Sequence, residues 1–199
     1  MLSGPSGAGK TELARLLRVR EPDVHYLITA TTRSPRPGER HGVDYYFFSE
    51  ADFRRSMDRG EFLECARIPP GTGFLYGSPR NQVEQALSRG QDVFTQVDVQ
   101  GARSIRAQLP DAVLIFLKPP DLETLQRRLA DRATEASDEL KDRLENARAE
   151  LACETEFDHS VINADGYLEE AVDRVRAIMR NERHRAAERG AFEHGEHGH

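Results

Sequence analysis

The sequence predicts an α/β fold with a parallel sheet covered by helices on both faces. Short apolar segments alternate with longer segments of helical periodicity over most of the 199 residues, and this alternation is typical of parallel sheets. A glycine-rich segment at residues 4–11 joins the first strand to the first helix. We expect one domain with small inserted subdomains, because a chain of this length can bury a substantial core.

Each expected element rests on a local signal. Apolar runs predict strands at residues 24–28, 45–48, 62–68, 74–76, 92–98, 112–117 and 159–163. Helical periodicity predicts helices at residues 10–19, 49–59, 78–90, 100–108, 121–131, 137–154 and 168–189. Ser49, with Asp52 three residues later, resembles a capping box, and Asp121 is a second expected N-cap. Two prolines and two glycines predict a loop at residues 29–45.

The glycine-rich segment fits the phosphate-binding motif G-x-x-x-x-G-K-[ST] at every position. We expect it to line the phosphate site of a nucleoside triphosphate with Gly4, Pro5, Ser6, Gly7, Ala8, Gly9, Lys10 and Thr11. Its glycines let the backbone turn tightly and direct several N–H groups at one anion. Lys10 can reach the β- and γ-phosphates, and the Thr11 hydroxyl can ligate Mg²⁺ directly. A glycine-rich turn with a stray lysine is the alternative, but the complete motif favours nucleoside triphosphate binding.

The segment before this loop is short for a central strand. Only Met1, Leu2 and Ser3 precede it, whereas strands average about five or six residues. Either the natural start lies upstream, or the protein tolerates a shortened central strand. We expect no signal peptide, because the loop begins at the fourth residue.

Composition argues against several classes of protein. Hydrophobic residues make up 38% and charged residues 31%, as in soluble globular proteins, and no apolar run reaches the roughly 20 residues of a membrane helix. We expect Cys65 and Cys153 to be reduced thiols in a cytoplasmic protein. The net charge of −6 argues against nucleic-acid binding. We expect a monomer or homodimer, with a disordered tail at residues 190–199.

A second cluster of candidate residues lies mostly within the loop at residues 29–45. Arginine offers two parallel donors to a phosphate, and tyrosine offers one hydroxyl donor. The candidate residues for binding a second phosphate are Arg33, Arg36, Tyr45 and Tyr76. A solvated surface charge is the alternative for any one arginine, and we favour it for Arg40.

These motifs together resemble the guanylate kinase family. The similarity lies in residues 31–39 (TTRSPRPGE) with Gly42, Asp44 and Tyr45, and in the form of the phosphate loop. It continues through residues 61–64, 76–78, 98–101, 128–129 and 132–135, and ends with Asn163. It covers the chain from Leu2 to about residue 180. It implies a three-layer fold of phosphate-loop NTPases with a GMP-binding insertion and a helical lid.

The resemblance assigns residues to the GMP site. Arg33, Arg36, Tyr45 and Tyr76 would hold the GMP phosphate, and the guanine would face Thr29, Glu64, Ser78 and Asp98. A carboxylate accepts hydrogen bonds from guanine N1–H and the 2-amino group, whereas adenine has no such donor edge. Each carboxylate could instead be an ion-pair partner or a helix cap.

The resemblance also implies a lid over ATP. Arg128, Arg132 and Arg143 would close over the ATP phosphates, and Asn163 would lie in the ATP site. The expected catalytic residues are these three arginines together with Lys10 and Arg33. The alternative is that the lid arginines are only solvent-exposed charges on helix surfaces. The implied single domain has a core at residues 1–32, 91–125 and 156–189, an insertion at 33–90 and a lid at 126–155.

The implied reaction is ATP-dependent phosphorylation of GMP or dGMP, giving GDP, with Mg²⁺ as cofactor. Two alternatives stay open: a related kinase acting on ribose bisphosphate, and a scaffold that binds proteins without catalysis. Two features depart from the family pattern. Gln96 occupies an expected acidic position, which would weaken Mg²⁺ placement, and the link at residues 69–73 is long.

Overall fold

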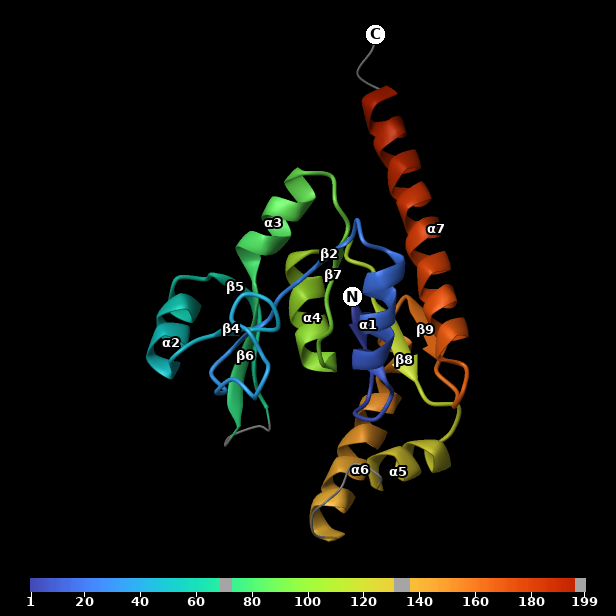
Figure 1. Cartoon of the computed structure of the whole chain (residues 1–199). Helices are drawn as coiled ribbons and strands as arrows, with labels where there is room; N and C mark the ends of the chain where they lie inside the picture. The colour runs from blue at the N-terminus through green and yellow to red at the C-terminus, as the bar shows by residue number, and fades with distance from the viewer. Residues whose placement is uncertain (69–72, 131–136, 196–199) are drawn as a thin grey trace. The chain divides into compact units, whose positions relative to one another are not determined.

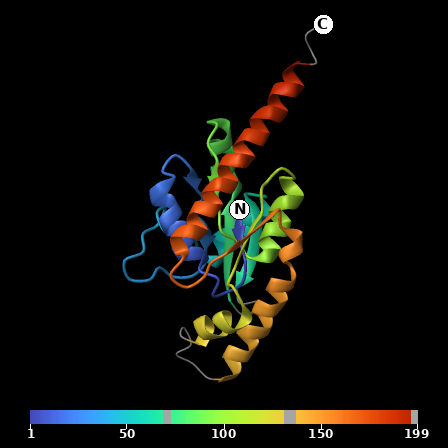
Figure 2. The same ribbon diagram turned by 90° about the vertical axis from the view of Figure 1, so that its right-hand side faces the viewer.

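The computed structural model describes residues 1–68, 73–130 and 137–195, and Figures 1 and 2 show its helices and strands. The chain divides into two compact units. The first unit holds Met1–Ser3 and Arg18–Ala112. The second holds Gly4–Leu17 and the described residues from Val113 onward.

The first unit contains both parallel and antiparallel strand pairs. Its strands are β1 (Leu2–Ser3), β2 (His25–Tyr26), β3 (Ala30–Thr31), β4 (Tyr46–Phe47), β5 (Phe62–Ile68), β6 (Phe74–Pro79) and β7 (Val93–Phe94). Its helices are α2 (Glu50–Asp58), α3 (Arg80–Ser88) and α4 (Val99–Gln108). Strands β2 and β7 are parallel. A mixed sheet has the order β4-β3-β6-β5, with β3 parallel to β4 and both other pairs antiparallel.

The second unit alternates helices with parallel strands. Its elements are α1 (Lys10–Arg20, which ends in the first unit), β8 (Ile115–Lys118), α5 (Leu122–Ala130), α6 (Ser137–Ala152), the short 3-10 helix η1 (Glu154–Glu156), β9 (His159–Ile162) and α7 (Leu168–Gly195). Strands β8 and β9 are parallel over four residue pairs. Helices α5 and α6 contact each other, and both views show them side by side (Figures 1 and 2). This arrangement confirms the predicted α/β class.

Several elements have shifted ends, as where β6 continues to Pro79 and β7 is only Val93–Phe94, and two larger differences from the predicted elements stand out. Strand β3 (Ala30–Thr31) lies where we expected only loop. Long-range pairing forms it, since Thr32 N donates to Leu75 O at 3.0 Å and Leu75 N donates to Thr32 Oγ1 at 2.9 Å. At the other end, α7 continues to Gly195, so residues 190–195, expected to be disordered, are helical. One glycine at position 190 costs about 1 kcal/mol in a helix, too little to stop it.

The short first strand is held by buried contacts. Leu2 N donates to Thr95 O at 2.9 Å, and Val97 N donates to Leu2 O at 3.2 Å. The Leu2 side chain is fully buried. Two backbone hydrogen bonds and a buried leucine therefore hold this two-residue strand against residues 95–97.

Side-chain caps begin two helices where the sequence predicts them. Ser49 Oγ accepts from Asp52 N at 3.1 Å at the start of α2. Asp121 Oδ1 accepts from Thr124 N at 2.7 Å before α5. Each cap satisfies an N–H group that has no partner within its own helix.

Separate apolar clusters support the two units. In the first unit one cluster contains Leu27, Leu63, Val83 and Ile105, and another contains Ala30, Phe53, Phe62 and Leu75. In the second unit Leu125, Leu129 and Ala147 join α5 to α6. Within the described ranges, no helix has the length and apolar character needed to cross a lipid bilayer.

Candidate active site

The phosphate loop packs too closely against its surroundings for side chains at Gly4 and Gly9. Their φ angles are 137° and 92°, a region that glycine adopts readily. A Cβ on Gly4 would lie 2.0 Å from the carbonyl oxygen of Leu117 in β8, and one on Gly9 would lie 2.3 Å from Nδ2 of Asn163. The motif glycines are therefore required by both conformation and space.

Positive groups converge on this loop. Lys10 Nζ donates to Gly4 O at 2.5 Å and to Pro5 O at 3.1 Å, so loop carbonyls hold the ammonium group. The N-terminus of α1 adds the positive end of a helix dipole. Thr11 is exposed in the first turn of α1, while Ser6 N donates to Glu150 Oε2 at 3.3 Å. The loop is thus built to bind an anion, with one N–H group directed at a carboxylate.

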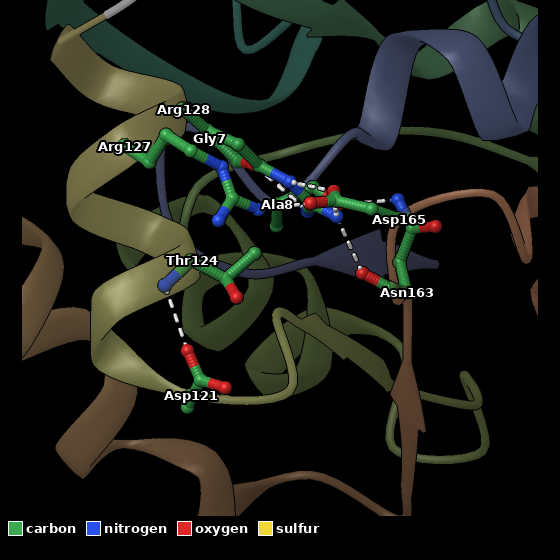
Figure 3. A network of polar contacts seen from close by, with 8 residues as sticks. All are labelled: Gly7, Ala8, Asp121, Thr124, Arg127, Arg128, Asn163 and Asp165. Carbon is green, nitrogen blue, oxygen red and sulfur yellow. Dashed lines mark hydrogen bonds and ion pairs between the residues drawn. The ribbon is translucent and has the colours of Figure 1, made fainter.

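Two further residues expected at the ATP site meet at the loop (Figure 3). Asn163, which is buried, donates from Nδ2 to Ala8 O at 2.8 Å. Arg128 donates from Nη2 to Asn163 O at 2.8 Å and from Nη1 to Gly7 O at 3.4 Å. Arg143 lies on α6 with an exposed side chain, and Arg132 lies outside the described residues.

In the first unit Arg33 is paired with a carboxylate. Its Nη1 and Nη2 atoms each lie 2.9 Å from an oxygen of Glu39, which also accepts from Arg36 N at 2.7 Å. The hydrogen bond between Arg33 and Glu39 raises the pKa of the arginine and lowers that of the glutamate. Only 12% of the Arg33 side chain is exposed. An internal anion therefore orients the guanidinium that we expected to bind phosphate.

Aromatic rings surround this guanidinium. Arg33 Cζ lies 5.3 Å from the ring centroid of Tyr45, and the rings of Tyr45 and Tyr76 are 6.2 Å apart. Burial raises the pKa of Tyr45, so its hydroxyl keeps the proton that it can donate. The Arg36 side chain is exposed nearby in sequence. The structure thus brings Arg33, Tyr45 and Tyr76 together.

Three of the four residues expected to bind guanine, Glu64, Ser78 and Asp98, form a polar cluster. Ser78 Oγ donates to Glu64 Oε1 at 2.6 Å, and Asp98 Oδ1 accepts from Gly101 N at 2.7 Å as the N-cap of α4. A Cβ built on Gly101 would lie 3.3 Å from an oxygen of each carboxylate, so Glu64 and Asp98 flank one point. Burial raises the pKa of Glu64. Thr29 is half-buried, and its carbonyl accepts from Tyr46 N at 2.9 Å.

Comparison with known proteins decides the family. A family model described as guanylate kinase matches residues 1–182. The chain belongs to the guanylate kinase family. Guanylate kinases from Thermobifida fusca and Rubrobacter xylanophilus are each 45% identical to it, over 179 and 180 residues. Each alignment covers 90% of this chain, with 89% of the first relative and 92% of the second.

A solved structure agrees with this assignment. The chain is similar to the guanylate kinase from Anaplasma phagocytophilum, with a TM-score of 0.70 and 30% identity. The similarity covers 91% of this chain and 83% of the other. The family resemblance and the fold class predicted from the sequence are therefore confirmed.

The structure adds two carboxylates that we did not predict in this guanylate kinase family member. Glu39 pairs with Arg33, and Asp165 accepts hydrogen bonds from Arg128 at 2.6 and 3.0 Å and pairs with Arg127 (Figure 3). Sequence signals for both exist. Glu39 lies in the arginine-containing string, and Asp165 follows Asn163 at the carboxyl end of a parallel strand, where α/β proteins place ligands.

Proposed function

We propose that this protein transfers the γ-phosphoryl group of ATP to GMP, giving ADP and GDP. Membership in the guanylate kinase family supports this reaction and disfavours ribose bisphosphate as the acceptor. The observation that carries the proposal is that one chain holds two distinct anion-binding sets. One is a complete phosphate loop with Lys10, and the other is Arg33 with Tyr45 and Tyr76. A separate cluster of Glu64, Ser78 and Asp98 offers the carboxylates that guanine requires.

On the donor side, the phosphate loop and Lys10 would bind the ATP phosphates. The lysine ammonium lies 2.5 Å from Gly4 O, so only a short side-chain movement would direct it at phosphate oxygens. Direct transfer requires little covalent participation by the protein, so positioning and charge stabilisation carry catalysis. We infer that Arg132 and Arg143 add positive charge at the phosphates, as the family resemblance implies, while Arg128 lies against the loop itself.

On the acceptor side, Arg33, Arg36 and the hydroxyls of Tyr45 and Tyr76 would bind the GMP phosphate. Glu64 would accept from N1–H and the 2-amino group of guanine, with Asp98, Ser78 and Thr29 shaping the same pocket. AMP would leave buried acceptors unpaired, which can reduce its use by roughly 10⁴-fold in favourable sites. The assigned contacts go to the phosphate and the base. Loss of the ribose 2′-hydroxyl should therefore matter little, and dGMP is the second expected acceptor.

The residues present fit a magnesium ion bound together with ATP. Mg²⁺ keeps several waters and uses few protein ligands beside substrate phosphates, and the exposed Thr11 hydroxyl at the start of α1 offers one such ligand. The described residues contain no group of three or more His, Cys, Asp or Glu that could hold a metal ion. When bound, the ion would neutralise charge on the β- and γ-phosphates.

The test measures ADP production from ATP and Mg²⁺ with separate acceptors. GMP, dGMP, AMP, UMP and ribose bisphosphate are each supplied to the same folded protein. We expect turnover with GMP and dGMP and little with AMP or UMP. Equal use of AMP would contradict the assigned guanine contacts, and turnover confined to ribose bisphosphate would overturn the proposed acceptor. No turnover with any acceptor, despite ATP binding, would favour a non-catalytic scaffold.

A further inference from the structure

We propose that Asp165 is a positioning residue for ATP, which acts through Arg128 on the shape of the phosphate loop. This inference rests on the proposed binding of ATP at that loop. Asp165 lies between β9 and α7 and points at the two arginines of α5 (Figure 3). It pairs with Arg127 and Arg128, and no role was expected for it from the sequence.

The hydrogen bonds of Arg128 show how the contact could act on the loop. A guanidinium has five N–H donors. Its Nε donates one to Asp165, Nη2 donates one to Asp165 and one to Asn163 O, and Nη1 donates one to Gly7 O. Four of the five therefore go to protein oxygens among the described residues. A group engaged in this way is better placed to organise the loop than to clamp a phosphate with two donors.

Asn163 continues the same network into the loop. Its carbonyl accepts from Arg128 at 2.8 Å, and its side-chain amide donates to Ala8 O at 2.8 Å. The C=O and N–H of one peptide unit point in opposite directions, because the unit is planar and trans. The hydrogen bond from Asn163 fixes the direction of Ala8 O, and the N–H of Gly9 in the same peptide unit therefore points away from Asn163. Arg128 on Gly7 O restrains the preceding peptide unit, whose N–H, on Ala8, donates to Pro5 O at 3.1 Å within the loop.

Asp165 supplies the charge that keeps Arg128 in this position. Hydrogen bonds between ionised partners are shorter and stronger than those between neutral ones. The Arg128 side chain is only 18% exposed, although Asp165 is 55% exposed. The hydrogen bond from Arg128 lowers the pKa of Asp165, so the carboxylate stays ionised at neutral pH. Without the Asp165 carboxylate, Arg128 would keep only its hydrogen bonds to the backbone carbonyls of Gly7 and Asn163.

The experiment compares Asp165→Asn with a matched control, Asp173→Asn. Asp173 is also exposed and pairs with an arginine, Arg176, but this pair lies within α7. Titration calorimetry measures the Kd for MgATP and, separately, for GMP, and thermal unfolding measures stability. We expect Asp165→Asn to raise the Kd for ATP about tenfold. Its Kd for GMP should not change, and Asp173→Asn should change neither Kd.

Three results would overturn the inference. An unchanged Kd for ATP would show that Asp165 is only a surface ion pair. Tighter ATP binding would show that Asp165 competes with phosphate for Arg128. Parallel weakening of ATP and GMP, with a lower Tm than the control, would indicate a general structural role. Since the assay needs no turnover, a wild-type protein that binds ATP but fails to phosphorylate GMP would contradict the proposed function alone.

Discussion

The two candidate anion sites of this protein are built in different ways. The phosphate loop presents backbone N–H groups, and its shape comes from glycines whose space is limited by Leu117 and Asn163. The acceptor site in the first unit presents side chains, and Glu39 holds its central arginine. Backbone donors are set once the loop folds, whereas a guanidinium on a flexible side chain needs a counterion to stay in place.

This difference separates two strategies for preorganisation. At the phosphate loop, Asn163 and Arg128 donate hydrogen bonds to the carbonyls of Ala8 and Gly7 and so restrain the loop backbone. At the acceptor site, a carboxylate restrains the binding group itself. Substitutions on the donor side should therefore affect catalysis and ATP, and those on the acceptor side should affect GMP.

The largest expected effect is that of Lys10→Ala on turnover. The substitution removes the ammonium group that would neutralise the transferring phosphoryl group, so kcat should fall by about 10²- to 10³-fold. Steady-state kinetics with saturating GMP measures it. The Kd for GMP, measured by calorimetry, should be unchanged. A variant with normal kcat would remove the phosphate loop from the proposed mechanism.

Arg33→Lys should weaken the acceptor site and leave the donor site intact. Lysine cannot make the two parallel hydrogen bonds of the guanidinium, so KM for GMP should rise about 30-fold, with KM for ATP unchanged. Arg40→Lys is the matched control, because Arg40 lies in the same loop and is exposed. An unchanged KM for GMP in both variants would show that only the net charge of this loop matters, because lysine keeps that charge.

Glu64→Gln should change the pH dependence of GMP use. Burial raises the pKa of Glu64 above that of an exposed glutamate. As pH falls through this raised pKa, the carboxylate takes up a proton and loses an acceptor for guanine, so KM for GMP should rise on acidification. In Glu64→Gln, KM at neutral pH should be about tenfold higher, and this acidic increase should disappear. An increase that persists in the variant would have to come from another group.

Ser78→Ala should have the smallest effect. Its hydroxyl donates to Glu64 at 2.6 Å, so the substitution removes a bond that favours the ionised carboxylate. KM for GMP should rise about threefold at neutral pH, and its acidic increase should begin at a higher pH. Profiles of KM against pH for both proteins measure the shift. A profile that keeps its position would show that Ser78 does not tune Glu64.

A region can be predicted from the sequence when the residues that form it are close together in the chain. Eight contiguous residues specify the phosphate loop, so its motif can be recognised from the sequence alone. The caps at Ser49 and Asp121 are similarly local. By contrast, β3 exists because two residues pair with strands distant in sequence. Glu39 and Asp165 were missed because a carboxylate in a loop reveals its arginine partner only when the chain is folded.

The acceptor residues lie between these extremes. Glu64, Ser78 and Asp98 are far apart in sequence, and neither spacing nor periodicity could have grouped them. The family resemblance named them, and the structure places the oxygens of Glu64 and Asp98 around Gly101. The role of Gln96 stays a prediction. So does that of Arg132, which lies outside the described residues.

The pairing of Glu39 with Arg33 has a consequence for how anions approach the acceptor site. Because Glu39 lies 2.9 Å from the Arg33 guanidinium, the pair carries little net charge when seen from a distance. Salt screens charge–charge interactions beyond about 8 Å at physiological ionic strength. The whole chain carries a net charge of −6, so anions in general receive little long-range attraction. At the proposed acceptor site, selection of GMP would therefore depend on the short-range contacts of its phosphate and guanine rather than on long-range attraction.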